Sequence, residues 1–391
     1  MKLYKSQPPK NISDFAKDFN FETLRPYYDT EAEEAMKRIA VYDSYHKAMA
    51  YLWPEMSREQ VIQKALNTKS PCEFQTGYMR DAIWKIVNST SAGLSWSGLE
   101  NLDKNKSYLY IANHRDILLD SAILQIILDK EDFETSEITF GSNLMEEGFI
   151  TDFGRMNRMF AVKREGTVKE LYDISRQLSA YIRHIILDKN TSVWIAQRNG
   201  RTKDGNDLTQ TGLLKMLNLS GDKGFKKSFE ELNIVPLTIS FEYEPCDSLK
   251  VQEAYLSSLH TKYVKAPGED LNSILTGIKQ PKGKIHVAFG KPIQNELVEI
   301  DKSANENEKI KKLATIIDKQ IHQGYKLNPV NYIAYDLLNQ TTIFENNYTS
   351  VEKENFLNYI SSKTNSMTGE PEVLKNLFFI LYSSPVVNKL K

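Results

Sequence analysis

The sequence predicts an α/β protein with a mixed, mainly parallel sheet flanked by helices, and with helical extensions at both ends. Between about residues 98 and 295, short β-branched and aromatic runs alternate with segments of helical spacing or length. Such alternation is typical of layers packed around a parallel sheet. The flanking sequences show helical patterns instead. We therefore predict a helical N-terminal region over residues 1–97, an α/β domain over 98–300 and a helical extension over 301–391.

The N-terminal region contains three segments with helical spacing. The first predicts a helix over about residues 31–53, with Thr30 and Glu33 as a capping-box pair and Pro54 as its end. The segment MSREQVIQKALN and residues 78–87 predict two more helices. The polar run NSTSAG, residues 88–93, predicts a loop.

Six runs in the central region predict strands. They are SYLYIAN, SEITFGS, RMFAVKR, TSVWIAQ, NIVPLTISFEY and GKIHVAFG. Between them, residues 168–187 are among the segments that predict helices, and four helical patterns follow after residue 305. In a parallel sheet, functional residues usually gather at the carboxyl ends of the strands, so we expect site residues directly after these runs.

Composition excludes several classes of protein. The 391 residues are enough for two or three folding units, and 50 Lys and Arg against 51 Asp and Glu give a net charge of −1, without a general attraction for nucleic acid. Cys72 and Cys246 are too few for a closed zinc site and fit a reducing compartment. There is no secretory signal and no run of roughly 18 to 20 apolar residues, so we expect a cytoplasmic protein.

The first candidate site follows the strand predicted over residues 107–112. The chain there reads Asn113-His114-Arg115-Asp116 and continues into an apolar helix, so His114 lies at an elbow where its imidazole can face a cleft. A histidine oriented by a carboxylate can take a proton from an attacking alcohol. Asp120 is the favoured carboxylate, because an unpaired charge in an apolar helix would be costly. Asp116 is the competing partner, and it can instead cap the helix.

This segment resembles the first motif of the glycerolipid and lysophospholipid acyltransferase family, Asn-His followed by four residues and Asp. Here five residues separate His114 from Asp120. Further blocks occur in the family's order. In RMFAVKREGTV, Lys163 and Arg164 end a strand, which resembles the block whose Arg binds the acceptor's phosphate. A guanidinium suits that role because it can donate two parallel hydrogen bonds. An exposed charge at a strand end is the alternative.

The third block, VWIAQRNGRTKDG, resembles the family's strand followed by Glu-Gly-x-Arg. Asn199 stands where the family has Glu, and Arg201 follows Gly200 directly. A solvated turn is the alternative interpretation. The strand NIVPLTISFEY, which contains Pro236, resembles the fourth block.

The resemblance implies transfer of a fatty acyl group from acyl-CoA or acyl carrier protein to a lysolipid hydroxyl in phospholipid synthesis. In the implied mechanism Asp120 orients His114, which deprotonates the acceptor. No metal or bound cofactor is implied. The favoured acceptor is 1-acylglycerol 3-phosphate, with an aminoacyl or ornithine-type lysolipid as the alternative. The substrate-binding residues implied are Asn113, Arg115, Lys163, Arg164, Asn199, Gly200, Arg201 and Pro236.

A lipid acceptor also implies partners and a location. We expect peripheral association with the inner face of a membrane, with acyl carrier protein as a further partner and no nucleic acid. Residues 223–229, which include Lys226 and Lys227, mix basic and aromatic side chains and could contact anionic lipid. A solvated helix face is equally compatible with this segment. The alternative from another class is a non-catalytic lipid-binding or scaffolding protein with the same fold.

Overall fold

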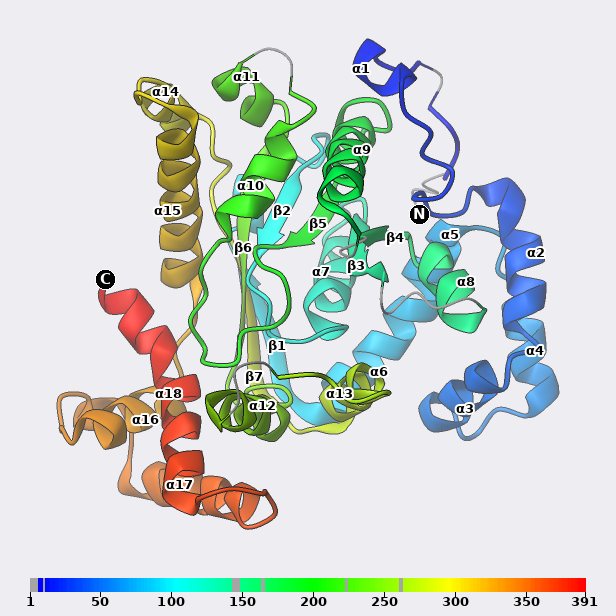
Figure 1. The fold of residues 1–391 in the computed structure, drawn as a ribbon. Helices are drawn as coiled ribbons and strands as arrows, with labels where there is room; N and C mark the ends of the chain where they lie inside the picture. The colour runs from blue at the N-terminus through cyan, green and yellow to red at the C-terminus, as the bar shows by residue number, and fades with distance from the viewer. Residues whose placement is uncertain (1–5, 10, 143–147, 163–165, 222–223, 260–262) are drawn as a thin grey trace.

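The computed structural model describes residues 6–9, 11–142, 148–162, 166–221, 224–259 and 263–391. Within these residues the chain forms one seven-stranded sheet with helices on both faces (Figure 1). The predicted fold class is therefore confirmed, including its helical N- and C-terminal segments. No helix in this part of the chain is both long and apolar enough to cross a membrane.

The sheet is parallel except for one pair of strands. Its strands in chain order are β1 (Ser91–Ser97), β2 (Leu109–Ala112), β3 (Glu137–Gly141), β4 (Met159–Val162), β5 (Val193–Ala196), β6 (Ile234–Phe241) and β7 (Gly283–Phe289). Their spatial order is β1-β7-β6-β2-β5-β3-β4, and only β6 and β7 pair antiparallel. β2 lies between β5 and β6, so the elbow after β2 is at the centre of the sheet.

One face of the sheet is covered by the N-terminal helices and by the helix that follows β2. These elements are α2 (Asp29–Ile39), α3 (Asp43–Leu52), α4 (Arg58–Leu66), α5 (Pro71–Glu73), the π-helix η1 (Phe74–Met79), α6 (Arg80–Thr90), the 3₁₀ turn η2 (Leu99–Asn101), α7 (Leu119–Lys130) and α8 (Phe149–Met156). Tyr110, Trp194 and Leu237 point from the strands into this core. Strand side chains alternate between faces, so each β-strand contributes every second residue here.

The opposite face is covered by helices from the second half of the α/β region, with α1 at their edge. They are α1 (Asp14–Lys17), α9 (Val168–Leu187), α10 (Thr211–Asn218), α11 (Phe225–Glu230), α14 (Asn295–Asp301) and α15 (Glu306–Gly324). Ile111, Phe160 and Ile195 point into this second core. Phe225 and Phe229 are buried in it as well, whereas Lys227 is exposed and Lys226 is half-buried.

A third core joins the segment between β6 and β7 to the C-terminal helices. Its elements are α12 (Asp247–Leu259), α16 (Pro329–Asn339), η4 (Glu345–Asn347), α17 (Ser350–Thr364) and α18 (Pro371–Leu390). A further helix, α13 (Glu269–Lys279), lies beside α6 in the same part of the molecule (Figure 1). The four predicted C-terminal helices correspond to α15, α16, α17 and α18.

The single helix predicted over residues 31–53 is wrong. The chain forms two helices, α2 and α3, because Tyr42 has an extended backbone (φ −71°, ψ 131°). The ring of His46 lies 2.9 Å from the carbonyl of Ala40 and satisfies that group at the end of α2. The capping box is also displaced: Glu31, not Glu33, accepts a hydrogen bond from the backbone N–H of Tyr28.

The predicted loop at residues 88–93 is wrong as well. Residues 88–90 end α6, and residues 91–93 begin β1, which pairs in parallel with β7 at one edge of the sheet. β1 is a half-exposed edge strand in which Leu94 and Trp96 alternate with small residues. It has no β-branched residue and it contains a glycine, so its sequence gives a weak strand signal.

A buried carboxylate fixes the C-terminal helices to α12. Asp247 is fully buried and accepts hydrogen bonds from Tyr359 Oη at 2.5 Å, Tyr382 Oη at 2.9 Å and Lys363 Nζ at 3.2 Å. Burial and the Asp247 carboxylate raise the pKa of Tyr359 and of Tyr382, so both phenols remain donors. This junction holds α17 and α18 against the α/β layer.

We expect Asp247→Ala to lower the free energy of unfolding by about 3 to 5 kcal/mol, the range for removing one partner of a buried ion pair. The two phenols and Lys363 would lose their common acceptor. Urea denaturation followed by circular dichroism measures the effect. Asp14→Ala, which removes an ion pair between two exposed side chains, serves as the control and should leave the midpoint unchanged. Equal midpoints for the two variants would contradict this account of the junction.

Candidate active site

The elbow after β2 brings His114 and Asp120 together. Nδ1 of His114 lies 3.0 Å from Oδ2 of Asp120, and the His114 side chain is 14% exposed at the wall of a cleft. The same Asp120 oxygen accepts hydrogen bonds from the backbone N–H of Arg115 at 2.6 Å and of Asp116 at 2.9 Å. Burial and the neighbouring Asp116 carboxylate raise the pKa of Asp120, while the two amide hydrogen bonds oppose that rise.

Asp116 forms the turn that lets this pair meet. Its Oδ1 accepts hydrogen bonds from the backbone N–H groups of Leu118 at 2.9 Å and Leu119 at 2.8 Å, as a helix cap does. α7 begins at Leu119, so Asp120 lies in its first turn. The extra residue between His114 and Asp120 therefore lies in the non-helical turn before α7. The structure favours Asp120 over Asp116 as the partner of His114.

The third-block loop lies against the elbow. The backbone N–H of Thr202 donates to the carbonyl of His114 at 3.0 Å, and the N–H of Gln197 donates to the carbonyl of Ala112 at 2.7 Å. Gly200 has a φ of +72°, a conformation that favours glycine and turns the loop back towards the sheet. Arg201, which follows, is brought to the same cleft as His114.

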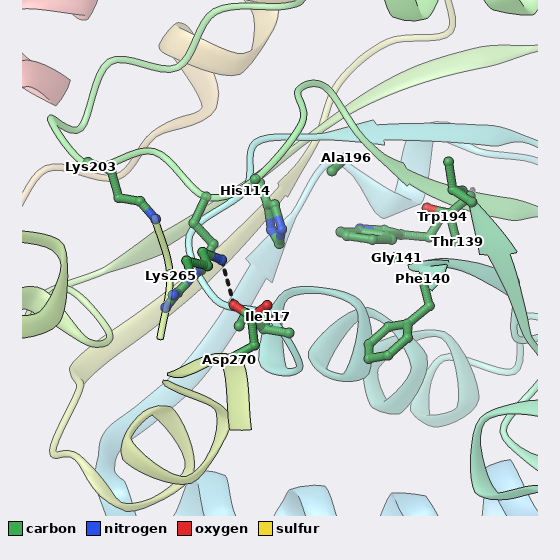
Figure 2. A pocket seen from close by; sticks show the side chains of 13 residues that line it. His114, Ile117, Thr139, Phe140, Gly141, Trp194, Ala196, Lys203, Lys265 and Asp270 are labelled. Carbon is green, nitrogen blue, oxygen red and sulfur yellow. Dashed lines mark hydrogen bonds and ion pairs between the residues drawn. The ribbon is translucent and has the colours of Figure 1, made fainter. Parts of the chain in front are cut away.

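The cleft opens at the carboxyl ends of β2, β3, β4 and β5 (Figure 2). Its lining residues are His114, Ile117, Thr139, Phe140, Gly141, Val162, Trp194, Ala196, Gly200, Arg201, Lys203, Lys265 and Asp270. Figure 2 shows the ring of Trp194 beside the imidazole, with Lys203 and Lys265 on the other side of His114. The His114 and Trp194 rings are 6.1 Å apart at an angle of 74°.

Two buried side chains that line the cleft have N–H donors without a partner among the described residues. Arg201 is 6% exposed and donates from Nη2 to Ser273 Oγ at 3.0 Å, but its Nη1 has no such partner. Trp194 is 3% exposed, and its indole N–H also lacks an acceptor in the described part of the chain. An unmade hydrogen bond by a buried donor costs about 1 to 3 kcal/mol. Both donors therefore have unused hydrogen-bonding capacity beside the cleft.

The cleft also carries an excess of positive charge. Lys203 Nζ pairs with Glu253 Oε2 of α12 at 2.7 Å, and Lys265 Nζ pairs with Asp270 Oδ1 of α13 at 2.5 Å. Burial, and then repulsion from Arg201, lower the pKa of Lys203 to about 8. A bound anion would reverse that shift, because an opposite charge favours the ammonium form. The electrostatics therefore match an anionic ligand.

The other predicted substrate-binding residues have different positions. Asn113 is buried and bridges β2 to β6 through both backbone groups of Ile239. The Arg115 guanidinium lies in a buried ion-pair network rather than in the cleft, and Pro236 is enclosed in β6. Asn199 is exposed just outside the residues that line the cleft. Asn113, Arg115 and Pro236 therefore belong to the structure that supports the site and not to the walls of the cleft.

Lys163 and Arg164 lie outside the described residues. The residue before them, Val162, ends β4 and lines the cleft. Their assignment to the acceptor's phosphate stays a prediction.

Sequence reasoning missed several residues of the cleft. Trp194 is in a predicted strand, two residues before its carboxyl end, and the period of two that places it on the face of Ala196 could have identified it. Lys203 follows Arg201 by two residues in the same loop. Lys265 and Asp270 belong to the segment between β6 and β7, where no sequence signal indicates that the chain returns to the cleft.

Comparison with known proteins supports the class inferred from this arrangement. The family model described as acyltransferase matches residues 94–240, which contain the elbow, the third-block loop and β2 to β6. This match confirms the predicted resemblance to acyltransferases and the expectation of an enzyme of that class. No curated protein sequence matches the chain.

A solved structure with similarity to the chain is that of the 1-acyl-sn-glycerophosphate (LPA) acyltransferase PlsC from Thermotoga maritima. The likeness has a TM-score of 0.38 and 11% sequence identity, and covers 74% of this chain and 94% of that one.

We expect Asp120→Asn to reduce the rate of acyl transfer far more than Asp116→Asn. The side-chain amide of the first variant would place a donor among the three donors that now meet at Oδ2, and losing an oriented base costs about 100- to 10,000-fold. An asparagine in place of Asp116 can still cap α7, so that change should cost at most about 1 kcal/mol of stability. Thiol release from an acyl-CoA measures the rates. The reverse ranking would make Asp116 the partner of His114.

Proposed function

We propose that the chain is an O-acyltransferase that moves a fatty acyl group from acyl-CoA or acyl carrier protein to the hydroxyl of a lysolipid. The observation that carries this proposal is the pairing of His114 with Asp120 in the same cleft as the unpartnered donors of Arg201 and Trp194. The pair supplies a base for a hydroxyl, and the donors supply a site for oxygen atoms. Both are needed for transfer of an acyl group to an anionic alcohol.

In the proposed mechanism Asp120 holds Nδ1 of His114, and Nε2 takes the proton of the acceptor hydroxyl. The hydroxyl oxygen attacks the thioester carbonyl carbon, and the carbon–sulfur bond breaks as the new ester forms. The proton on Nε2 then passes to the departing thiolate, so atoms and charge balance. The cationic side chains would hold the acceptor's anionic head and orient it for the attack.

Among acceptors, 1-acylglycerol 3-phosphate fits the cleft best. Arg201 can donate to two phosphate oxygens, and Lys203 adds a second cation to the same wall. Lys163 and Arg164 are proposed to complete the phosphate site. An ornithine-type lysolipid, which carries a carboxylate and an ammonium, would use Asp270 as well and is the competing acceptor. No metal or bound cofactor takes part in the proposed reaction.

The proposed location is the cytoplasm, with peripheral attachment to the inner face of a membrane that presents the lipid acceptor. Attachment would place the cleft where a lysolipid can enter while its acyl chain stays in the bilayer. Lys227 of α11 is exposed and Lys226 is half-buried beside Glu230, and both lysines would favour anionic lipid. Acyl carrier protein is the proposed protein partner where it serves as donor.

We expect His114→Ala to remove acyl transfer while the protein stays folded. Loss of a general base typically costs about 100- to 10,000-fold in rate. The assay presents a panel of lysolipids in anionic vesicles with acyl-CoA or acyl carrier protein as donor, and circular dichroism verifies folding. His46→Ala, which removes a histidine remote from the cleft, is the matched control. A His114→Ala variant with more than roughly a tenth of the normal rate would exclude His114 as the base. No transfer by the wild-type protein with any donor and acceptor would favour the lipid-binding or scaffolding alternative.

We expect Arg201→Lys to raise the apparent KM for a phosphate-bearing acceptor and to leave the donor's KM little changed. Lysine keeps the charge but loses the planar fork that donates to two oxygens. A charge-assisted hydrogen bond of roughly 1.5 to 3 kcal/mol corresponds to an approximately 10- to 150-fold loss in acceptor kcat/KM. Steady-state kinetics with each substrate varied in turn give the values. An unchanged acceptor kcat/KM would exclude Arg201 from the head-group site.

A further inference from the structure

Four charged side chains form a buried network beneath the elbow. They are Arg115, Asp207, Glu244 and Lys250, and none is more than 2% exposed. Arg115 donates from Nη2 to Asp207 at 2.5 Å and from Nη1 to Glu244 at 3.1 Å, and its guanidinium lies 5.0 Å from the centre of the Tyr325 ring. Two cations face two anions, so the network is electrically neutral.

Lys250 connects this network to the backbone of the elbow. Its Nζ donates to Glu244 Oε1 at 2.6 Å and to the backbone carbonyl of Arg115 at 2.6 Å. Lys250 belongs to α12, in the segment between β6 and β7, beyond the residues that match the acyltransferase family model. A fully buried ammonium is costly unless it is paired and hydrogen-bonded. One of the two partners of this ammonium is the carbonyl of the Arg115–Asp116 peptide, one residue after His114.

That peptide lies between a cation and an anion. The group linking Arg115 to Asp116 accepts from Lys250 through its carbonyl and donates to Asp120 Oδ2 through its N–H at 2.9 Å. Hydrogen bonds at the two ends of one peptide polarise each other, and the effect is larger in a buried environment. The carboxylate that holds His114 is thus tied through a single peptide group to the ammonium of α12.

We propose that Lys250 is a positioning residue for acyl transfer: from α12 it holds the Arg115–Asp116 peptide and thereby sets the position of Asp120 against His114. This inference rests on the proposed function. It assigns a role to α12 that is separate from the walls of the cleft. Lys250 does not line the cleft, so it acts only through the elbow.

The charge of Lys250 also reaches the pair. Asp120 is faced by His114, Asp116 and the Arg115 amide of the elbow and by Lys250 of α12, and the ammonium lowers the pKa of Asp120. Removing the ammonium should raise the affinity of both Asp120 and His114 for a proton. The proton affinities of the two side chains would therefore rise together.

The test replaces Lys250 with Met, which has similar length but neither charge nor donor. We expect kcat to fall by about 10- to 100-fold, the scale of a small misplacement of a catalytic group. The acceptor KM should change little, because Lys250 does not touch the acceptor. The acid limb of the kcat/KM profile should move to higher pH. A purely structural role would alter none of these in the folded protein.

Lys250→Met leaves the negative charge of Glu244 without its lysine partner. A second variant is designed for the case in which that loss prevents folding. Glu244→Gln combined with Lys250→Met keeps the network neutral, so we expect it to fold and still to show the lower kcat and the shifted acid limb. Lys363→Met is the matched control, since this lysine pairs with Asp247 of α12 away from the elbow. It should leave kcat and the pH profile unchanged. A folded double variant with normal kcat and a normal profile would overturn the proposal.

A measurement without substrate separates this inference from the proposed function. In an NMR titration, the imidazole of His114 should take up its proton at higher pH in the double variant than in the single variant Glu244→Gln, because these two proteins differ only at Lys250. An unchanged titration would show that Lys250 does not act on the pair, whatever the enzyme's activity. A shifted titration in a protein that transfers no acyl group would instead refute the proposed function while retaining the electrostatic role of Lys250.

Discussion

One carboxylate oxygen determines the geometry of the site. Oδ2 of Asp120 receives Nδ1 of His114 and the backbone N–H groups of Arg115 and Asp116, so three consecutive residues are oriented by one acceptor. The two amides fix the path of the elbow, and the imidazole is oriented by the same atom. The turn and the candidate base are therefore not independent features. A change that moves the carboxylate changes both.

Burying that carboxylate requires compensation, which comes from every side of the elbow. β6 holds Asn113, the third-block loop holds the carbonyl of His114, and α12 supplies Lys250 to the carbonyl of Arg115. Arg115, which the family resemblance implied to be a substrate-binding residue, is instead a buried cation paired with two acids. A buried ion pair is weak evidence for stability and better evidence for a specified geometry. Here the specified geometry is that of the elbow.

How much of this arrangement the sequence predicted depends on how far apart the interacting residues lie along the chain. The six strands and the meeting of His114 with Asp120 depend on local pattern and on the parallel sheet, and both were predictable. β1 was not, because an edge strand with a glycine and no β-branched residue carries little β signal. The role of Arg115 was also hidden, since Glu244 lies 129 residues away and only folding brings its charge to the elbow. Motifs predict which residues gather at a site better than they predict where each side chain points.

The side chains of the cleft come from two separate parts of the chain. His114, at the elbow after β2, and Asp120, in the first turn of α7, lie within the part of the chain that matches the acyltransferase family model. Lys265 and Asp270, and the Ser273 hydroxyl that accepts from Arg201, come from the segment between β6 and β7, beyond that part. Loops carried by a rigid layer can vary while the layer keeps the catalytic groups in register. The segment that ends in α13 therefore forms a wall of the cleft that is distinct from the layer holding His114 and Asp120.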